Sequence, residues 1–395
     1  MSMTILEADL TWTGARFERG VRIQIEDGTI VAVGAAAEAP DQRLRDRALL
    51  PGFVNAHSHA FLRGLRGGGG GELDFAVELD PERLRSVTLE AFREMRAAGV
   101  TSVGEFHYLH HATDDADYAF DEVVLEAAQE AGLRIVLLNA YLNTGALGKP
   151  LHRAQQRFRS ASPDAYWKQM DRLLPFCEGE ARHLGAGVHS VRAAGRDDLA
   201  DVYNEARRRG FVFHLQLEDT REEIEACRAA CGLRPMEALL ESVELGESAT
   251  CIHCTHTDPG LMERYAHAGG NVCVCPLLEN DLGTGIERLG EIEAVAIGTD
   301  SNARISLLQD MRSLERGRRG LAVRLLQAGT VAGARALGLP AGRIASRCWA
   351  DFVAVDLNAP SLKGWTDATL AESLVRDAGA DAIAGTCVGG RWTHR

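Results

Sequence analysis

The sequence lacks any uninterrupted apolar run long enough to cross a bilayer. Its first residues, MSMTILEADLTWTG, also lack the basic start and the continuous apolar core of a signal peptide. There is no excess of positive charge either, because the formal net charge is -13. A protein without a basic surface is a poor partner for nucleic acid or for an anionic membrane. We therefore expect a cytoplasmic protein that binds a small molecule, with neither nucleic acid nor a membrane as its partner.

A disulfide framework is absent from the sequence. The nine cysteines are an odd number scattered over 395 residues, which fits the reduced thiols of a cytosolic protein. The motif CIHC at 251–254 has the spacing of a zinc-ligand pair, but no second cysteine pair follows at zinc-finger distance. We interpret this motif as two buried cysteines that flank a histidine at the end of a strand.

Short strands dominate the two ends of the chain, and strands alternate with helices in its middle. Residues 1–50 hold alternating runs such as VRIQIEDG and TIVAVG, separated by turn signals. Residues 51–344 hold short apolar strands, each followed by a stretch rich in Ala, Arg and Glu, and this predicts an α/β fold with a TIM-like (β/α)8 barrel. Residues 345–395 return to strands, so we expect both ends to form one small β-sandwich domain. The run GGGGG at 67–71 predicts either a mobile loop at the mouth of the barrel or a plain linker.

A pair of histidines ends the first predicted barrel strand. The segment PGFVNAHSHAF places His57 and His59 two residues apart. Side chains at alternate positions of a strand point to the same side, so both imidazoles can face the barrel interior and bind one ion. The pattern by itself is a weak signal for metal binding. Its position after an apolar strand makes it informative.

Polar side chains recur at the ends of the later predicted strands. In a (β/α)8 barrel these carboxyl ends lie on one face, where catalytic groups collect. A single residue of this kind can cap a helix or be satisfied in the core, but packing alone does not explain their repetition. The residues are His107, Tyr108, His189, Arg192, His214, Gln216, His253, His256 and Asp300.

From about Leu50 to about Pro340 the sequence resembles the amidohydrolase superfamily, and within it the N-formimidoyl-glutamate deiminases of histidine degradation. The resemblance rests on the motifs LPGFVNAHSHAF, TSVGEFHYLHH, GVHSVRA, EIEACRAACGLRP, IHCTHTD, LLENDLGTGI and GTDSNARISLLQDMRSLE. It implies a hydrolase that releases ammonia from a non-peptide C–N bond, most simply by converting formimidoyl-glutamate to formyl-glutamate. It also suggests a homodimer.

The resemblance further implies one divalent metal, with zinc as the first choice and iron as the alternative. His57, His59 and Asp300 would be ligands, joined by a residue of the fifth strand. His253 and Asp300 would orient and deprotonate the metal-bound water, and an acid on the fifth strand would pass the proton to the leaving nitrogen. A divalent ion makes hydroxide available at neutral pH because it lowers the pKa of bound water towards about 7. The residues that would hold the substrate are Tyr108, His189 and Arg192.

The fifth-strand segment FHLQLED departs from the family pattern HIHIAEQ. In register with that pattern, Gln216 occupies the position of the metal-binding histidine and Asp219 that of the glutamate. Three interpretations stay open. In the first, the Gln216 carbonyl oxygen is a weaker ligand and Asp219 carries the proton. In the second, a local shift brings His214 to the metal and Glu218 to the acid position, since strand alternation places both on the face of Gln216. In the third, the site binds metal poorly or not at all.

Two further departures concern the substrate. Leu62 stands where the family has a glutamine, and an apolar side chain cannot hydrogen-bond a formimidoyl group. The segment GGGGGELDFAVELDP is shorter than its family counterpart and lacks the tryptophan and arginine found there. Two alternatives to formimidoyl-glutamate deimination follow. One is a divergent paralogue that acts on another carboxylate-bearing amidine or amine, and the other is a catalytically impaired barrel used for binding.

Overall fold

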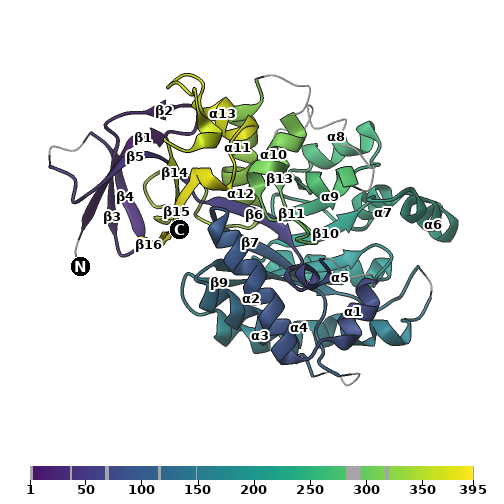
Figure 1. Ribbon diagram of the computed structural model, residues 1–395. Coiled ribbons are helices and arrows are strands. Elements are labelled where there is room, and N and C mark those ends of the chain that lie inside the picture. The colour runs from purple at the N-terminus through teal and green to yellow at the C-terminus, as the bar shows by residue number, and fades with distance from the viewer. Residues whose placement is uncertain are drawn as a thin grey trace.

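The computed structural model describes residues 3–35, 38–66, 71–113, 117–147, 149–281, 295–315 and 320–394. Figure 1 shows a large body of strands and helices with a sheet projecting from one end. Most of the glycine run at 67–71, for which the sequence predicts a loop or linker, lies outside the described residues. Within the described ranges, no helix is long and apolar enough to cross a membrane.

The barrel strands are β6 (Phe53–Ser58), β7 (Val100–His107), β8 (Arg134–Tyr141), β9 (Arg182–Ser190), β10 (Phe213–Leu217), β11 (Ala249–His253), β12 (Asn271–Val274) and β13 (Val295–Ile297). They form one sheet in chain order, and each neighbouring pair is parallel. Every residue of β7 and β8 is buried, as expected for parallel strands covered on both faces. The predicted (β/α)8 architecture is therefore confirmed.

Backbone contacts bring the two edges of this sheet together. Ser58 at the end of β6 forms a parallel bridge with Asp300, which follows β13. The amide of Thr299 donates to the carbonyl of His57 at 3.0 Å, and the amide of His59 donates to the carbonyl of Asp300 at 2.8 Å. Candidate site residues that are far apart in the sequence thus lie on adjacent strand ends.

Helices cover the outside of the barrel (Figure 1). They are α2 (Pro81–Ala97), α3 (Ala119–Ala131), α4 (Pro163–Leu173), α5 (Arg196–Arg209), α6 (Arg221–Cys231), α7 (Pro235–Ser242), α8 (Pro259–His267), α9 (Pro276–Asp281), α10 (Leu307–Glu315), α11 (Ala322–Gln327) and α12 (Gly333–Ala336). In α2 the Asp80 side chain caps the first turn and Pro81 opens the helix, a common start signal. Its buried face includes Leu84, Phe92 and Met95. Two short segments, η1 (Ala60–Leu65) and α1 (Glu72–Glu78), follow β6.

Strands from both chain ends form a second sheet, at the left of Figure 1. They are β1 (Thr4–Trp12), β2 (Phe17–Glu18), β3 (Arg22–Glu26), β4 (Thr29–Gly34), β5 (Gln42–Pro51), β14 (Phe352–Asp356), β15 (Ile383–Val388) and β16 (Arg391–His394). β5 pairs with β1 in parallel and with β14 antiparallel, so hydrogen bonds join both ends of the chain into one mixed sheet. Its own apolar cluster includes Leu6, Ile23, Ile30, Leu49 and Phe352. α13 (Leu370–Arg376) lies between β14 and β15 in the sequence.

A buried ion pair connects this sheet to the barrel. Arg134 begins β8 and Asp351 precedes β14, and the two side chains are 5% and 2% exposed. The Arg134 Nε atom donates to an Asp351 oxygen at 2.8 Å, and a second guanidinium nitrogen donates to the other oxygen at 3.2 Å. The attraction between the paired guanidinium and carboxylate offsets the cost of removing each charge from water, a cost that neither group could meet alone.

Candidate metal centre and active site

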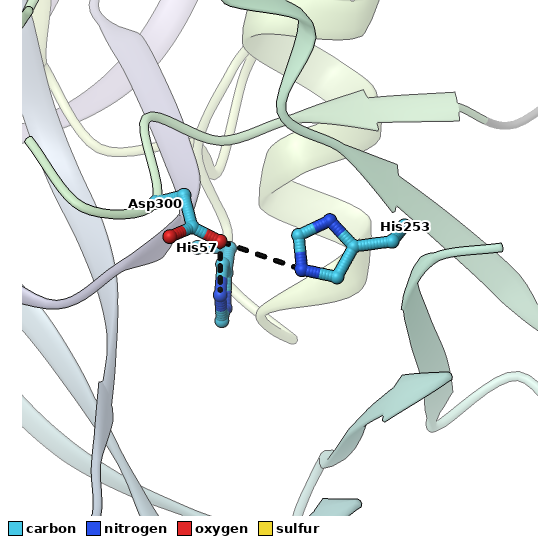
Figure 2. Close-up of side chains that lie close together, drawn as sticks. All are labelled: His57, His253 and Asp300. Atoms are coloured by element: carbon cyan, nitrogen blue, oxygen red, sulfur yellow. Dashed lines mark ion pairs between the residues drawn. The ribbon is translucent and has the colours of Figure 1, made fainter. Parts of the chain in front are cut away.

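Three buried side chains meet at the carboxyl end of the barrel (Figure 2). His57 comes from β6, His253 ends β11 and Asp300 follows β13. The Oδ2 atom of Asp300 lies 3.3 Å from Nε2 of His57 and 3.4 Å from Nε2 of His253. Each of the three residues offers one ligand atom within 4.8 Å of the other two. This arrangement can surround a single metal ion.

Two members of this cluster have unusual backbone conformations. The φ angles of His253 and Asp300 are 70° and 52°, in the left-handed region that a residue with a side chain rarely adopts. Such conformations cost of the order of 1–3 kcal/mol each and persist where the surrounding structure enforces them. Here the Asp300 carbonyl is held by the His59 amide. Strain concentrated at these strand ends is typical of a functional site.

The electrostatics of the cluster separate its carboxylate from its imidazoles. Burial would raise the pKa of Asp300, but its hydrogen bond with His57 and the nearby imidazoles lower that pKa below its usual range. Burial lowers the pKa of His57. For His253, burial also acts to lower the pKa, but the hydrogen bond with Glu279 and the charge of Asp300 raise it to about 10. Without a metal, the cluster therefore holds an ionised aspartate beside a cationic His253.

His59 is fixed in one tautomer and contacts Gln216. Its Nδ1 atom donates to the carbonyl of Phe106 at 2.8 Å, so Nε2 carries the lone pair. The amide nitrogen of Gln216 lies 3.1 Å from this Nε2 and is the donor in that contact. Burial lowers the pKa of His59 to about 3, so the ring is neutral at pH 7. A neutral imidazole oriented through its second nitrogen is the form that binds metal.

These residues fit a divalent metal. His57 is completely buried, and its Nδ1 atom has no hydrogen-bond partner among the described residues. His57 and His59 are held neutral by burial while Asp300 is held ionised, which is the protonation pattern that metal ligands require. The residues able to hold the ion are His57, His59, Asp300 and, after rotation of its amide, Gln216.

The alternative fifth-strand residues face other partners. His214 is fully buried, and its Nε2 atom donates to the carbonyl of Ala336 at 2.9 Å. Glu218 accepts hydrogen bonds from Arg234 at 3.1 and 3.3 Å and from the Met236 amide at 3.2 Å. The expectation that Glu218 shares a face with Gln216 is wrong, because β10 ends at Leu217 and Glu218 turns into the left-handed region with φ 52°. The geometry therefore brings Gln216, and neither His214 nor Glu218, to His59.

Asp219 lies beside His253 and is accompanied by a second acid. Its Oδ1 atom is buried without a hydrogen-bond partner among the described residues and lies 4.0 Å from Nδ1 of His253. The Asp219 amide donates at 3.3 Å to the side chain of Glu223. Glu223 lies in the first turn of α6, where its own amide donates to the capping hydroxyl of Thr220. Burial raises the pKa of Glu223 to about 7. Glu223 opens the motif EIEACRAACGLRP, but the sequence assigned this acid no role in the site.

Glu279 is another site residue: it lies in the motif LLENDLGTGI, but the sequence assigned it no role. It lies on α9, and its Oε1 atom is 3.2 Å from Nδ1 of His253 and 2.8 Å from the amide of Cys275. The carboxylate thus holds the His253 ring with Nε2 directed at Asp300. Only its place one helical turn after the end of β12 hints at this role.

The three residues expected to hold the substrate lie on β7 and β9 or directly after them. The Tyr108 ring centroid is 5.1 Å from that of His59 and 4.8 Å from that of His189. Burial and the charge of Arg192 lower the pKa of His189 to about 4, so this ring is neutral. Arg192 is exposed, and within the described ranges no residue forms an ion pair or side-chain hydrogen bond with its guanidinium.

His107, one residue before Tyr108, points away from the centre. Its Nε2 atom lies 3.2 Å from an oxygen of Asp121 on α3, and Nδ1 of His110 lies 2.8 Å from the same oxygen. The second Asp121 oxygen accepts from the amides of Asn139 and Gln169. This buried network joins the end of β7 to the surrounding helices and thereby fixes the position of Tyr108. His107 is thus a strand-end histidine with a structural role.

The sequence from residue 48 to residue 393 matches the profile of the amidohydrolase family, so the chain belongs to this family. It is 30% identical to the formimidoylglutamate deiminase of Pseudomonas aeruginosa, over 95% of this chain and 91% of the relative. It is 31% identical to a 5-methylthioadenosine/S-adenosylhomocysteine deaminase of Natronomonas pharaonis, over 85% of this chain and 80% of that protein.

Solved structures agree with this assignment. An amidohydrolase from Brucella melitensis superposes with a TM-score of 0.86 at 27% identity, covering 98% of this chain and 94% of that one. An adenosine deaminase from Xanthomonas campestris with bound zinc shares the fold, with a TM-score of 0.82 at 23% identity and coverage of 98% and 92%. The chain is an enzyme of the amidohydrolase family, whose members use a divalent metal, and its relatives named here are deiminases and deaminases.

Proposed function

We propose that this protein is a metal-dependent deiminase of small amidines or amines, with formimidoyl-glutamate as the first substrate to test. The products would be formyl-glutamate and ammonia. The buried cluster of His57, His253 and Asp300 beside His59 carries the proposal, because it combines neutral ligands, an ionised carboxylate and a protonatable imidazole at one strand-end face. The resemblance to a deiminase along almost the whole chain supports the substrate.

The proposed ligands are His57, His59, Asp300 and Gln216, for zinc or, alternatively, iron. When bound, a divalent ion lowers the pKa of a water molecule so that hydroxide is available at neutral pH. His253 holds its Nε2 atom towards Asp300. A divalent ion bound beside this ring would favour its neutral form over the cationic form of the metal-free protein, and the neutral ring could orient the attacking oxygen and take part in removing its proton.

Asp219 is the proposed proton carrier. Water gives its oxygen to the amidine carbon and its two protons to the nitrogen that leaves as ammonia. The buried Oδ1 of Asp219, 4.0 Å from His253, supports a route for these protons. Aspartate reaches about 1.5 Å less than glutamate, one carbon–carbon bond, so the substrate must sit correspondingly closer to β10.

Tyr108, His189 and Arg192 are proposed to hold the substrate. The Arg192 guanidinium suits a carboxylate because it can form two parallel hydrogen bonds with it. Its exposure and its lack of an ion-pair partner in the described part of the chain support this role. The homodimer and the cytoplasmic location stay predictions.

Two other functions are to be tested against this one. One alternative is a divergent paralogue that acts on another carboxylate-bearing amidine or amine. It is favoured by the buried apolar side chain of Leu62, in the helix η1 that begins directly after His59. The deaminases among the relatives also favour it. A barrel that only binds its ligand is favoured by Gln216, whose amide nitrogen and not its oxygen faces His59.

Metal analysis and ammonia release together test the proposal. Protein purified without chelators should contain close to one zinc or iron per chain and release ammonia from formimidoyl-glutamate. His57→Ala and Asp300→Ala should abolish both, whereas His267→Ala, at an exposed histidine on α8, should change neither. Metal without ammonia release would reject this substrate, and a folded protein that binds no metal would favour the binding-only barrel.

A further inference from the structure

Glu72 and Tyr108 form a hydrogen-bonded pair next to the candidate metal centre. Glu72 opens α1, and its Oε1 atom accepts a hydrogen bond from the Tyr108 hydroxyl. The position of α1 is set by Arg157, whose buried guanidinium donates to the carbonyls of Ala76 and Leu79. Glu72 is therefore held by the folded structure and is half-buried.

The pair presents only hydrogen-bond acceptors to a ligand. The single proton of the Tyr108 hydroxyl is used in the bond to Glu72, which leaves the phenol oxygen with lone pairs. The carboxylate has a second oxygen, and apart from Tyr108 no described residue forms a hydrogen bond or ion pair with Glu72. A ligand group that binds to these atoms must therefore donate hydrogen bonds from N–H or O–H groups.

Glu72 also lies within the electrostatic reach of the centre. Burial raises the pKa of Glu72, the hydrogen bond with Tyr108 opposes this rise, and the charge of Asp300 adds to it, so that the pKa is raised overall. The Tyr108 ring that holds Glu72 packs against His59 and His189. A half-buried carboxylate with no cation beside it is unfavourable, and a cationic group placed against it would offset that cost.

We propose that Glu72 and Tyr108 bind a cationic nitrogen group of the substrate and select it against its neutral isostere. An amidinium, a guanidinium or an ammonium group has the required charge and N–H donors. With a carboxylate at Arg192, this defines the substrate class as a small zwitterion or amino-acid derivative with a cationic nitrogen. The inference rests on the proposed function and specifies the ligand of the same site.

A pair of near-isosteric ligands tests this recognition by binding alone. N-amidino-L-glutamate carries a guanidinium group, and N-carbamoyl-L-glutamate carries a neutral urea of the same shape. Calorimetry on the metal-loaded protein should show the guanidinium compound binding at least about tenfold more tightly. Glu72→Gln should weaken binding of the guanidinium compound only, and should therefore bring the ratio of the two affinities close to one. Glu78→Gln, at the exposed far end of α1, is the matched control and should keep the wild-type ratio.

Three results would overturn the inference. These are equal binding of the two ligands by the wild-type protein, a ratio that survives Glu72→Gln, and failure to bind either ligand. The proposed function is judged separately by ammonia release from formimidoyl-glutamate. Ammonia release with no selectivity for the cation would leave the function standing and reject the role of Glu72. Selectivity without ammonia release would keep the recognition and reject the substrate.

Discussion

Replacing Gln216 by histidine should raise the affinity of the metal-free protein for zinc by about tenfold or more. The change introduces an imidazole at the position next to Nε2 of His59, and zinc prefers imidazole to a neutral carbonyl oxygen. Competition with a chromophoric chelator, on protein stripped of metal, measures this affinity without relying on catalysis.

The magnitude follows from the contact that the metal must displace. The Gln216 amide lies 3.1 Å from the His59 lone pair, so this hydrogen bond has to break before His59 can bind an ion. A neutral hydrogen bond contributes about 1 kcal/mol, which is roughly fivefold in affinity because about 1.4 kcal/mol corresponds to tenfold. Zinc also binds an imidazole nitrogen more strongly than an amide oxygen, and the two effects together should raise the zinc affinity by at least about tenfold.

A surface histidine controls for adventitious binding. Gln129 is exposed near the C-terminal end of α3. Helices of a (β/α)8 barrel run antiparallel to the strands, so this end of α3 lies at the opposite face from the carboxyl ends of the strands. Gln129→His should leave the zinc affinity at the wild-type value. If Gln216→His leaves the affinity unchanged or lowers it, Gln216 is not at a ligand position and the reasoning is refuted.

Three further predictions concern other residues of the site. Asp219→Asn should lower kcat for ammonia release by about 10²–10⁴-fold, the usual contribution of a general acid–base group, while metal content stays the same; an unchanged kcat would exclude Asp219 as proton carrier. Burial raises the pKa of Glu223 from 4.5 to about 7 in the folded protein, so stability falls as pH rises between these values, where the unfolded chain has already released its proton. Glu223→Gln should therefore shrink the difference in thermal midpoint between about pH 5 and about pH 8, and an equal difference in both proteins would count against this assignment. Gly298→Ala should lower metal content, because the added Cβ would lie 2.7 Å from both Cβ and the carbonyl oxygen of His57; unchanged metal content in the folded variant would refute that.

The barrel could be predicted because its strands have a simple pattern. Parallel strands covered on both faces read as short continuous apolar runs, and β7 and β8 show this along their full length. His57, His253 and Asp300 could be found in the same way, since each lies at or directly after the end of such a strand. The structure brings these three together.

Strand alternation failed where strands end. It correctly separates His107 from Tyr108, but it does not say which of the two faces the interior. The structure answers this through Asp121, which draws His107 outward. At FHLQLED the alternation stops at Leu217, and the left-handed conformation of Glu218 directs its carboxylate to Arg234. A backbone turn of this kind leaves no periodic trace in the sequence.

Acids contributed by helices and loops were beyond sequence reasoning altogether. Glu72, Glu223 and Glu279 are three of 56 acidic residues. Glu223 and Glu279 lie within the motifs EIEACRAACGLRP and LLENDLGTGI, but these motifs indicate the family and do not say which acid faces the site. Each reaches the site only because a helix packs against a particular strand end. Such contacts depend on tertiary packing, which a single sequence does not display.

The carboxylates around the centre differ in whether they already have a cation. Asp300 is surrounded by imidazoles, and its pKa is lowered, whereas the pKa values of Glu72 and Glu223 are raised because burial outweighs any nearby positive charge. Asp300 has positive charge beside it within the chain, in His253, whereas the one hydrogen-bond partner of Glu72 among the described residues is the neutral Tyr108 hydroxyl. An arriving cation has most to offer a carboxylate that lacks a positive partner, and this is why we base the substrate class on Glu72.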